Sequence, residues 1–177
     1  PQIVQIGLPK LNAYLFFEPG KNLFHLSNSG IKGQRSLFMG ESAGLNYDME
    51  KLPSLETNSM KFLETIREMD FKDYTDFVQT EKSKQINSLK AQKNLSAKAR
   101  TIGEMNIQFQ FANALLSFNQ NKKIGNYYMN RNLKQEDQIE FTEEKLNAAE
   151  LKNILKDTPV NKELALVCNQ YGSLIGS

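Results

Sequence analysis

Two residue types that often carry out catalysis occur once each in this chain of 177 residues. His25 lies between Phe24 and Leu26 in a run typical of a β-strand, so we interpret it as a structural or surface residue rather than a general base. Cys168 falls on the apolar side of an expected helix, where small buried thiols are common. With one histidine and one cysteine, the chain can form neither an internal disulfide nor a zinc site with several imidazoles.

A serine motif is the second candidate for chemistry. Gly40-Glu41-Ser42-Ala43-Gly44 has the letters of a hydrolase nucleophile elbow, G-x-S-x-G. That motif needs a strand before the serine, a helix after it and a histidine further along the chain. The run at residues 35–39 can supply the strand, but the only histidine lies upstream. We therefore interpret these glycines as residues of a loop. We assign no catalytic residue, no cofactor and no metal ligand.

The distribution of charge is more informative than the net charge of +2. Residues 81–134 hold ten basic and two acidic groups, whereas residues 135–177 hold four basic and eight acidic groups. Cations interleaved with aromatic side chains suit phosphate contact and base stacking, so this basic region is a candidate site for nucleic acid or another polyanion. The acidic flanks can also neutralise it. The candidate residues are Lys82, Lys84, Lys90, Lys93, Lys98, Arg100, Lys122, Lys123, Arg131 and Lys134.

Four aromatic side chains stand at positions where we expect solvent: Tyr74, Phe77, Tyr127 and Tyr128. Exposed aromatic residues are typical of surfaces that contact other proteins. We therefore expect a non-catalytic helical interaction protein, a structural subunit, adaptor or effector that binds a protein partner or itself. Binding of a polyanion through residues 81–134 is the alternative, and an enzyme with an unrecognised site is the second alternative.

The first fifty residues read as strands, because short β-rich runs alternate there with turn residues. Strands are expected at residues 2–6, 12–17, 22–27 and 35–39. Pro19-Gly20 separates two of these runs and predicts a hairpin, since proline presets the turn and glycine tolerates positive φ. We expect this β-rich segment to pack on the helices that follow.

Residues 51–177 show helical spacing of apolar residues. Ser54 is the expected N-cap of a first helix, Asp70 marks a break before a second, and the polar run at residues 79–94 is expected to be solvated or a connecting arm. Ser96 starts the strongest pattern, in which residues 102–118 are apolar over more than half of the helix surface and should form a central buried rod. An Asn- and Lys-rich connection is expected after Gly125.

Two further helices are expected near the end of the chain. An acidic helix begins at about residue 142, and a last helix starts with Thr158 as its cap and Pro159 at its first position. The overall expectation is a mainly α (α+β) fold: a bundle of about four to five helices in residues 51–177, with a small hairpin or antiparallel sheet in residues 1–50, forming one domain. No run reaches the roughly 18 apolar residues that cross a bilayer, and we expect a cytoplasmic protein, with secretion as an alternative.

Overall fold

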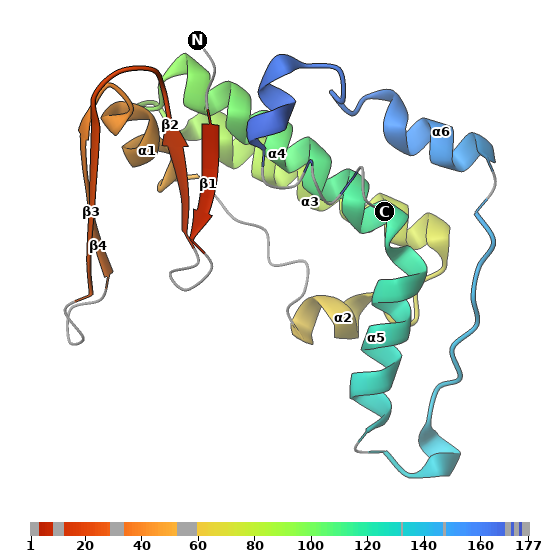
Figure 1. The fold of residues 1–177 in the computed structure, drawn as a ribbon. Coiled ribbons are helices and arrows are strands. Elements are labelled where there is room, and N and C mark those ends of the chain that lie inside the picture. Colours follow the sequence, from red (N-terminus) through yellow and green to blue (C-terminus); the bar gives the residue numbers. More distant parts are fainter. Residues whose placement is uncertain are drawn as a thin grey trace.

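The computed structural model describes residues 4–8, 13–28, 34–52, 60–131, 133–146, 148–168, 171 and 174. Within these residues the chain is mainly helical with a small β component (Figure 1), which confirms the expected α+β class. Strands come first and helices follow. The order is β1 (Val4–Leu8), β2 (Ala13–Phe17), β3 (Asn22–Asn28), β4 (Gln34–Gly40), α1 (Ala43–Met49), α2 (Met60–Ile66), α3 (Phe71–Ala91), α4 (Ala97–Leu116), α5 (Phe118–Asn130) and α6 (Ala148–Lys156), with 3₁₀ turns at Gln135–Asp137 and Glu163–Val167.

Helix α4 is the central element, as its apolar pattern predicts. Ser96 caps it by accepting a hydrogen bond from the Ala99 N–H. One face of the helix, with Ile102 and Phe109, packs with β2, α1 and the C-terminal residues. The opposite face, with Ile107 and Phe111, packs with α2 and α3. Both apolar clusters of the molecule therefore share this one helix.

The predicted rod at residues 102–118 ends earlier than expected. Helix α4 stops at Leu116, and α5 begins at Phe118 and points away from it (Figure 1). The Asn- and Lys-rich connection expected after Gly125 is wrong, because α5 continues to Asn130. Gly125 permits a close approach to α2, since a Cβ at this position would lie 2.8 Å from the Leu63 carbonyl oxygen.

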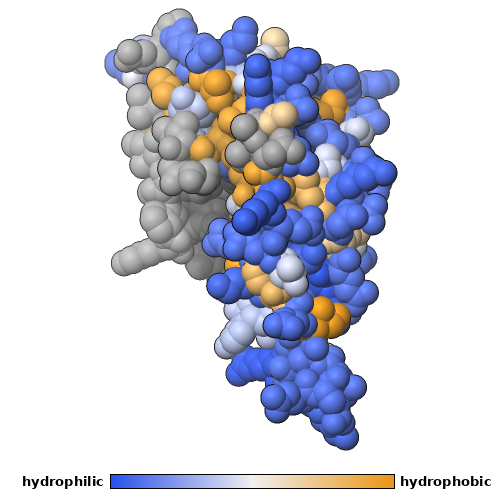
Figure 2. Space-filling view, turned by 90° about the vertical axis from the view of Figure 1, so that its right-hand side faces the viewer, coloured by the Kyte–Doolittle hydropathy of each residue, from blue (hydrophilic) through white to orange (hydrophobic). Residues whose placement is uncertain are grey.

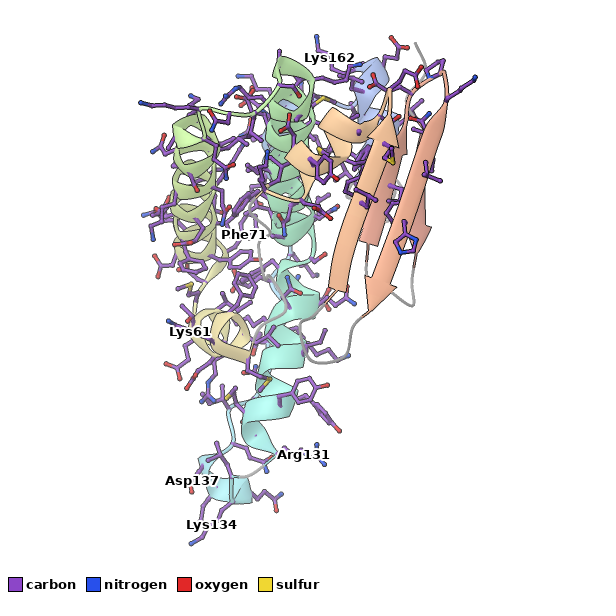
Figure 3. The ribbon with its side chains drawn as sticks, turned by 90° about the vertical axis from the view of Figure 1, so that its left-hand side faces the viewer. Lys61, Phe71, Arg131, Lys134, Asp137 and Lys162 are labelled. Carbon is purple, nitrogen blue, oxygen red and sulfur yellow. The ribbon has the colours of Figure 1, made fainter. Side chains whose placement is uncertain are left out.

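Helix α3 begins where the break was predicted. Asp70 caps it by accepting a hydrogen bond from the Asp73 N–H at 2.8 Å. The helix continues through the polar run to Ala91, and the fully buried Leu89 lies in the cluster that α3 shares with α4. A short turn leads into α4, so the two long helices lie side by side (Figure 3). The Ser54 cap predicted for the preceding helix lies outside the described residues; α2 itself is described from Met60.

The strands pair as two separate antiparallel ladders, β1 with β2 and β3 with β4. The predicted hairpin at Pro19-Gly20 is therefore wrong, since this turn connects strands that belong to different sheets. Helix α1, which the sequence analysis did not predict, explains the difference. Its Asn46 side chain binds both the N–H and the C=O of Phe16 in β2, at 2.9 and 2.7 Å. The free edge of β2 is thus occupied by a side chain, and no strand can pair there.

The C-terminal region departs most from the expected helices. Residues 138–146 have no helix or strand, so the helix expected from about residue 142 begins only with α6 at Ala148. Thr158 closes α6, because its hydroxyl donates to the Ile154 carbonyl at 3.1 Å and its N–H donates to the Leu155 carbonyl. It is therefore not the cap of a following helix. In place of the last predicted helix, the described residues contain the 3₁₀ turn at Glu163–Val167.

Candidate functional site

The residues first considered for chemistry do not meet. His25 is exposed on β3. Ser42 has the strand before it and the helix after it that an elbow needs, but it is buried, and its Oγ accepts a hydrogen bond from the Glu18 N–H at 2.6 Å. Burial raises the pKa of the Cys168 thiol to about 12, so it is protonated at neutral pH. Ser42 and Cys168 are therefore buried structural residues, whereas His25 is an exposed strand residue.

Half of the ten basic candidates are engaged within the chain. Lys84, Lys98, Lys122 and Lys134 form ion pairs with Glu81, Glu18, Glu144 and Glu136. The Arg100 guanidinium donates to the carbonyls of Leu89 and Gln92 and so closes the C-terminal end of α3. The other five candidates have neither an ion pair nor a side-chain hydrogen bond within the described part of the chain: Lys82, Lys90, Lys93, Lys123 and Arg131.

The remaining cations do not form one surface. Lys82 lies in the middle of α3, Lys90 in its last turn and Lys93 in the turn that follows. Figure 3 shows Arg131 and Lys134 at the lower tip, beside Asp137. The same tip is uniformly hydrophilic in Figure 2 and carries charges of both signs, including Glu136. The basic region is therefore spread over α3, α5 and the lower tip.

The aromatic candidates also separate. The expectation that Tyr74 is exposed is wrong, because its side chain is fully buried and its hydroxyl donates to the Ala114 carbonyl at 2.8 Å. Phe77 is half-buried and packs against Phe62. Tyr127 and Tyr128 are exposed on α5, as expected, and lie edge to face with ring centroids 5.5 Å apart.

The most developed polar arrangement joins α5 to residues 138–146, which we call the strap. The strap runs alongside α5 from the lower tip back toward α6 (Figure 1). Asn119 donates to the Glu144 carbonyl at 2.8 Å and accepts from the Glu144 N–H at 3.0 Å. Asn130 binds Ile139 in the same way, at 2.7 and 3.1 Å. Two helix side chains thus hold the strap by its main chain.

Glu144 is the anchor of the strap. Its carboxylate accepts a hydrogen bond from the Phe71 N–H at 3.0 Å, at the start of α3, and forms an ion pair with Lys122 at 3.2 Å. Lys122 also donates to the Met69 carbonyl at 2.7 Å and lies over the Phe118 ring. A carboxylate at a helix N-terminus is favoured by the helix dipole, so this residue satisfies groups from two helices.

A third asparagine lies between these two contacts. Asn119, Asn126 and Asn130 are separated by seven and four residues, which places them on one face of α5. We call these three residues the asparagine face. Asn126 is only 3% exposed, yet neither its Oδ1 nor its Nδ2 has a hydrogen-bond partner among the described residues. A buried amide without partners costs free energy and calls for an explanation.

The outward face of the β3–β4 hairpin is the second unusual surface. Leu23, Leu37 and Met39 are exposed by 59, 48 and 52%, and Leu23 lies opposite Met39 in the register. The inward face is packed, since the Phe24 and Phe38 rings stack at 5.2 Å and Phe38 meets Tyr47 of α1 edge to face. One side of this two-stranded sheet is therefore buried, and the other exposes these three apolar side chains together with His25, which lies opposite Leu37.

Neither the asparagine face of α5 nor the outward face of the β3–β4 hairpin was predicted from the sequence. The asparagine spacing on α5 was a readable signal, because a separation of seven and four residues is helical, but the segment was interpreted as a connection. A scan of protein-family models and searches of curated proteins and of solved structures found no match to this chain. Among the described residues, no helix combines the length and apolar content needed to span a membrane, and no three potential metal ligands gather.

Proposed function

We propose that this protein is a non-catalytic interaction protein that associates with a second copy of itself through the outward face of the β3–β4 hairpin. The observation behind the proposal is the row of three large apolar side chains, Leu23, Leu37 and Met39, on a face that nothing in the described chain covers. An isolated two-stranded hairpin is marginally stable in water, and sheets gain stability by packing face to face.

A second copy suits this face because the same apolar row would meet itself across a two-fold axis, the commonest symmetry of soluble oligomers. Antiparallel pairing keeps the three side chains on one side of the hairpin, where a facing sheet can interdigitate with them. The patch is small against the roughly 800 Å² that each partner of a stable complex buries. We therefore expect a weak dimer whose population rises with protein concentration.

Sedimentation velocity at rising concentration tests the proposal. The wild type is expected to shift from monomer to dimer, and Leu37→Glu is expected to stay monomeric because a charge in the apolar row must be desolvated on association. Leu166→Glu is the matched control, since Leu166 is also an exposed leucine but lies in the 3₁₀ turn at Glu163–Val167. A wild type that stays monomeric throughout, or equal behaviour of the two variants, would contradict the proposal.

Binding of a polyanion is a second candidate, and the unpaired Lys90 and Lys93 near the end of α3 favour it. Neutralisation of phosphates by lysines makes affinity fall steeply with salt. A labelled single-stranded oligonucleotide should bind at low salt, and the double variant Lys90→Glu/Lys93→Glu should bind more weakly than the control Lys61→Glu on α2. Absence of binding at low salt would rule this candidate out.

A further inference from the structure

We propose that the asparagine face of α5, with Lys122, is a binding site for an extended acidic segment of a partner protein, and that the strap occupies this site when the partner is absent. The site uses a surface other than the β3–β4 hairpin, so it goes beyond the association proposed above. Its ligand class follows from how the strap is held.

The contacts recognise an extended main chain. Asn119 and Asn130 each pair one donor and one acceptor with a single strap residue, the pattern by which a neighbouring strand would bind it. The spacing of these two contacts matches such a ligand. Eleven residues of helix and five residues of extended chain both span about 16 to 17 Å. Any extended polypeptide of suitable side chains can make the same contacts.

Asn126 indicates that the strap does not use the whole site. It lies between Asn119 and Asn130 on the same face of α5 and is almost completely buried, with both polar atoms unpartnered in the described chain. A structural role alone does not explain a buried amide that has no partner among the described residues, since an apolar side chain would be less costly there. A ligand whose main chain lies closer to α5 at this point would satisfy it.

Charge and burial define the side chains of the ligand. In the strap, Ile139 and Phe141 are half-buried and Glu144 is bound by Lys122 and the Phe71 N–H, whereas Glu140 and Glu143 are exposed. Lys123 lies on α5 close to this face and has no ion-pair partner in the described chain. The site therefore fits a segment with two apolar residues separated by one position, and with a glutamate three positions after the second apolar residue.

The strap is suited to being displaced. The described residues 138–146 lack helix and strand, so exchange of the strap for a partner breaks no regular secondary structure. Helices α5 and α6 remain attached at its two ends. A tethered ligand acts at an effective concentration of about millimolar, so a partner must either bind more tightly than the strap or meet a weakened strap.

A fluorescently labelled peptide with the sequence of residues 137–146, DQIEFTEEKL, is the probe. Its affinity is measured by anisotropy for the full-length wild type and for Glu144→Ala, which removes the anchor of the strap but leaves α5 unchanged. Because hydrogen bonds to charged groups are among the stronger ones, we expect the variant to bind the peptide about tenfold more tightly, or better. Equal affinity of the two proteins would overturn the proposal.

Asn126→Leu, placed in the Glu144→Ala background, separates a binding role from a structural one. If Asn126 serves a ligand, this substitution weakens peptide binding at least about fivefold while the thermal midpoint stays equal or rises, since an orphaned amide is removed. Unchanged peptide affinity would count against the assignment of Asn126. A peptide carrying alanine in place of its second consecutive glutamate should bind weakly to every variant.

Two further measurements keep the test decisive. If Glu144→Ala does not fold, hydrogen exchange of the wild type with excess peptide replaces it, and the Ile139 and Glu144 amides should lose protection as the strap leaves. Unchanged protection under saturating peptide would overturn the proposal. Leu37→Glu should bind the peptide like its parent, so failure of hairpin association and failure of peptide binding are distinguishable.

Discussion

Asn46 of α1 binds both main-chain polar groups of Phe16 in β2, accepting from its N–H at 2.9 Å and donating to its carbonyl at 2.7 Å. Asn119 and Asn130 of α5 do the same for Glu144 and Ile139 of the strap. In three places an asparagine on a helix thus takes the position of a neighbouring strand. Extended segments of this chain are held against helices by amide side chains.

Replacing Asn46 tests this arrangement. Asn46→Ala leaves the buried N–H and C=O of Phe16 without partners and also removes a hydrogen bond to the Ser42 carbonyl. We expect the free energy of unfolding to fall by about 2 to 4 kcal/mol, measured by urea denaturation. Asn87→Ala, at an exposed position of α3, is the control and should change it by less than about 0.5 kcal/mol. Equal effects would contradict the importance of the pairing.

Two glycines in helices should respond oppositely to alanine. Gly125→Ala places a methyl group 2.8 Å from the Leu63 carbonyl oxygen, so α2 and α5 must separate, and we expect a loss of about 1 to 2 kcal/mol. Gly44→Ala in α1 meets nothing within 4 Å and should gain about 0.5 to 1 kcal/mol from restricting the unfolded chain. Thermal unfolding measures both. A stabilised Gly125→Ala would show that the helices are not in close contact there.

Tyr74 should make the protein less stable in alkali. Burial raises the pKa of its hydroxyl from 10.0 to about 12, against a smaller lowering by a hydrogen bond from Asn121. The folded state therefore retains a proton that the unfolded state loses, and stability declines as pH rises from 10 toward 12. Tyr74→Phe should lose about 1 kcal/mol at neutral pH, with the hydrogen bond to Ala114, and should show a shallower decline in alkali. Urea denaturation at several pH values measures the slope.

The thiol of Cys168 should be unreactive while the protein is folded. It is buried, and burial raises its pKa from 9.0 to about 12, so the thiolate needed for reaction is scarce at pH 8. An aromatic disulfide reagent should label it only after denaturant is added. Rapid labelling of the native protein would show that the C-terminal residues open readily from α4.

Local signals predicted the elements whose boundaries are set within the chain itself. Asp70 and Ser96 were predicted as helix starts from their residue types and the apolar spacing that follows them. In the structure each accepts a hydrogen bond from the N–H three residues later, a contact between residues close in sequence. The apolar periodicity of α4 was strong enough to indicate its burial. These features needed no information about distant residues.

The errors arise where a distant side chain replaces a local partner. The Pro19-Gly20 turn has good hairpin chemistry, but Asn46 takes the edge of β2, and the turn cannot bring β3 to it. The strap has helix-forming residues, but Asn119 holds the main chain of Glu144 in an extended form. Thr158 was read as the start of a helix and instead bonds backward to Ile154. Each contact depends on tertiary structure, which periodicity does not encode.

The two-sided burial of α4 has a consequence for how the protein comes apart. Ile102 and Phe109 belong to one apolar cluster, and Ile107 and Phe111 belong to the other. When α4 unfolds, both clusters therefore lose buried contacts. The N-terminal strands and the long helices should therefore denature in a single concerted transition, with calorimetric and van't Hoff enthalpies that agree. Proteolysis should accordingly yield no stable subfragment that lacks residues 97–116.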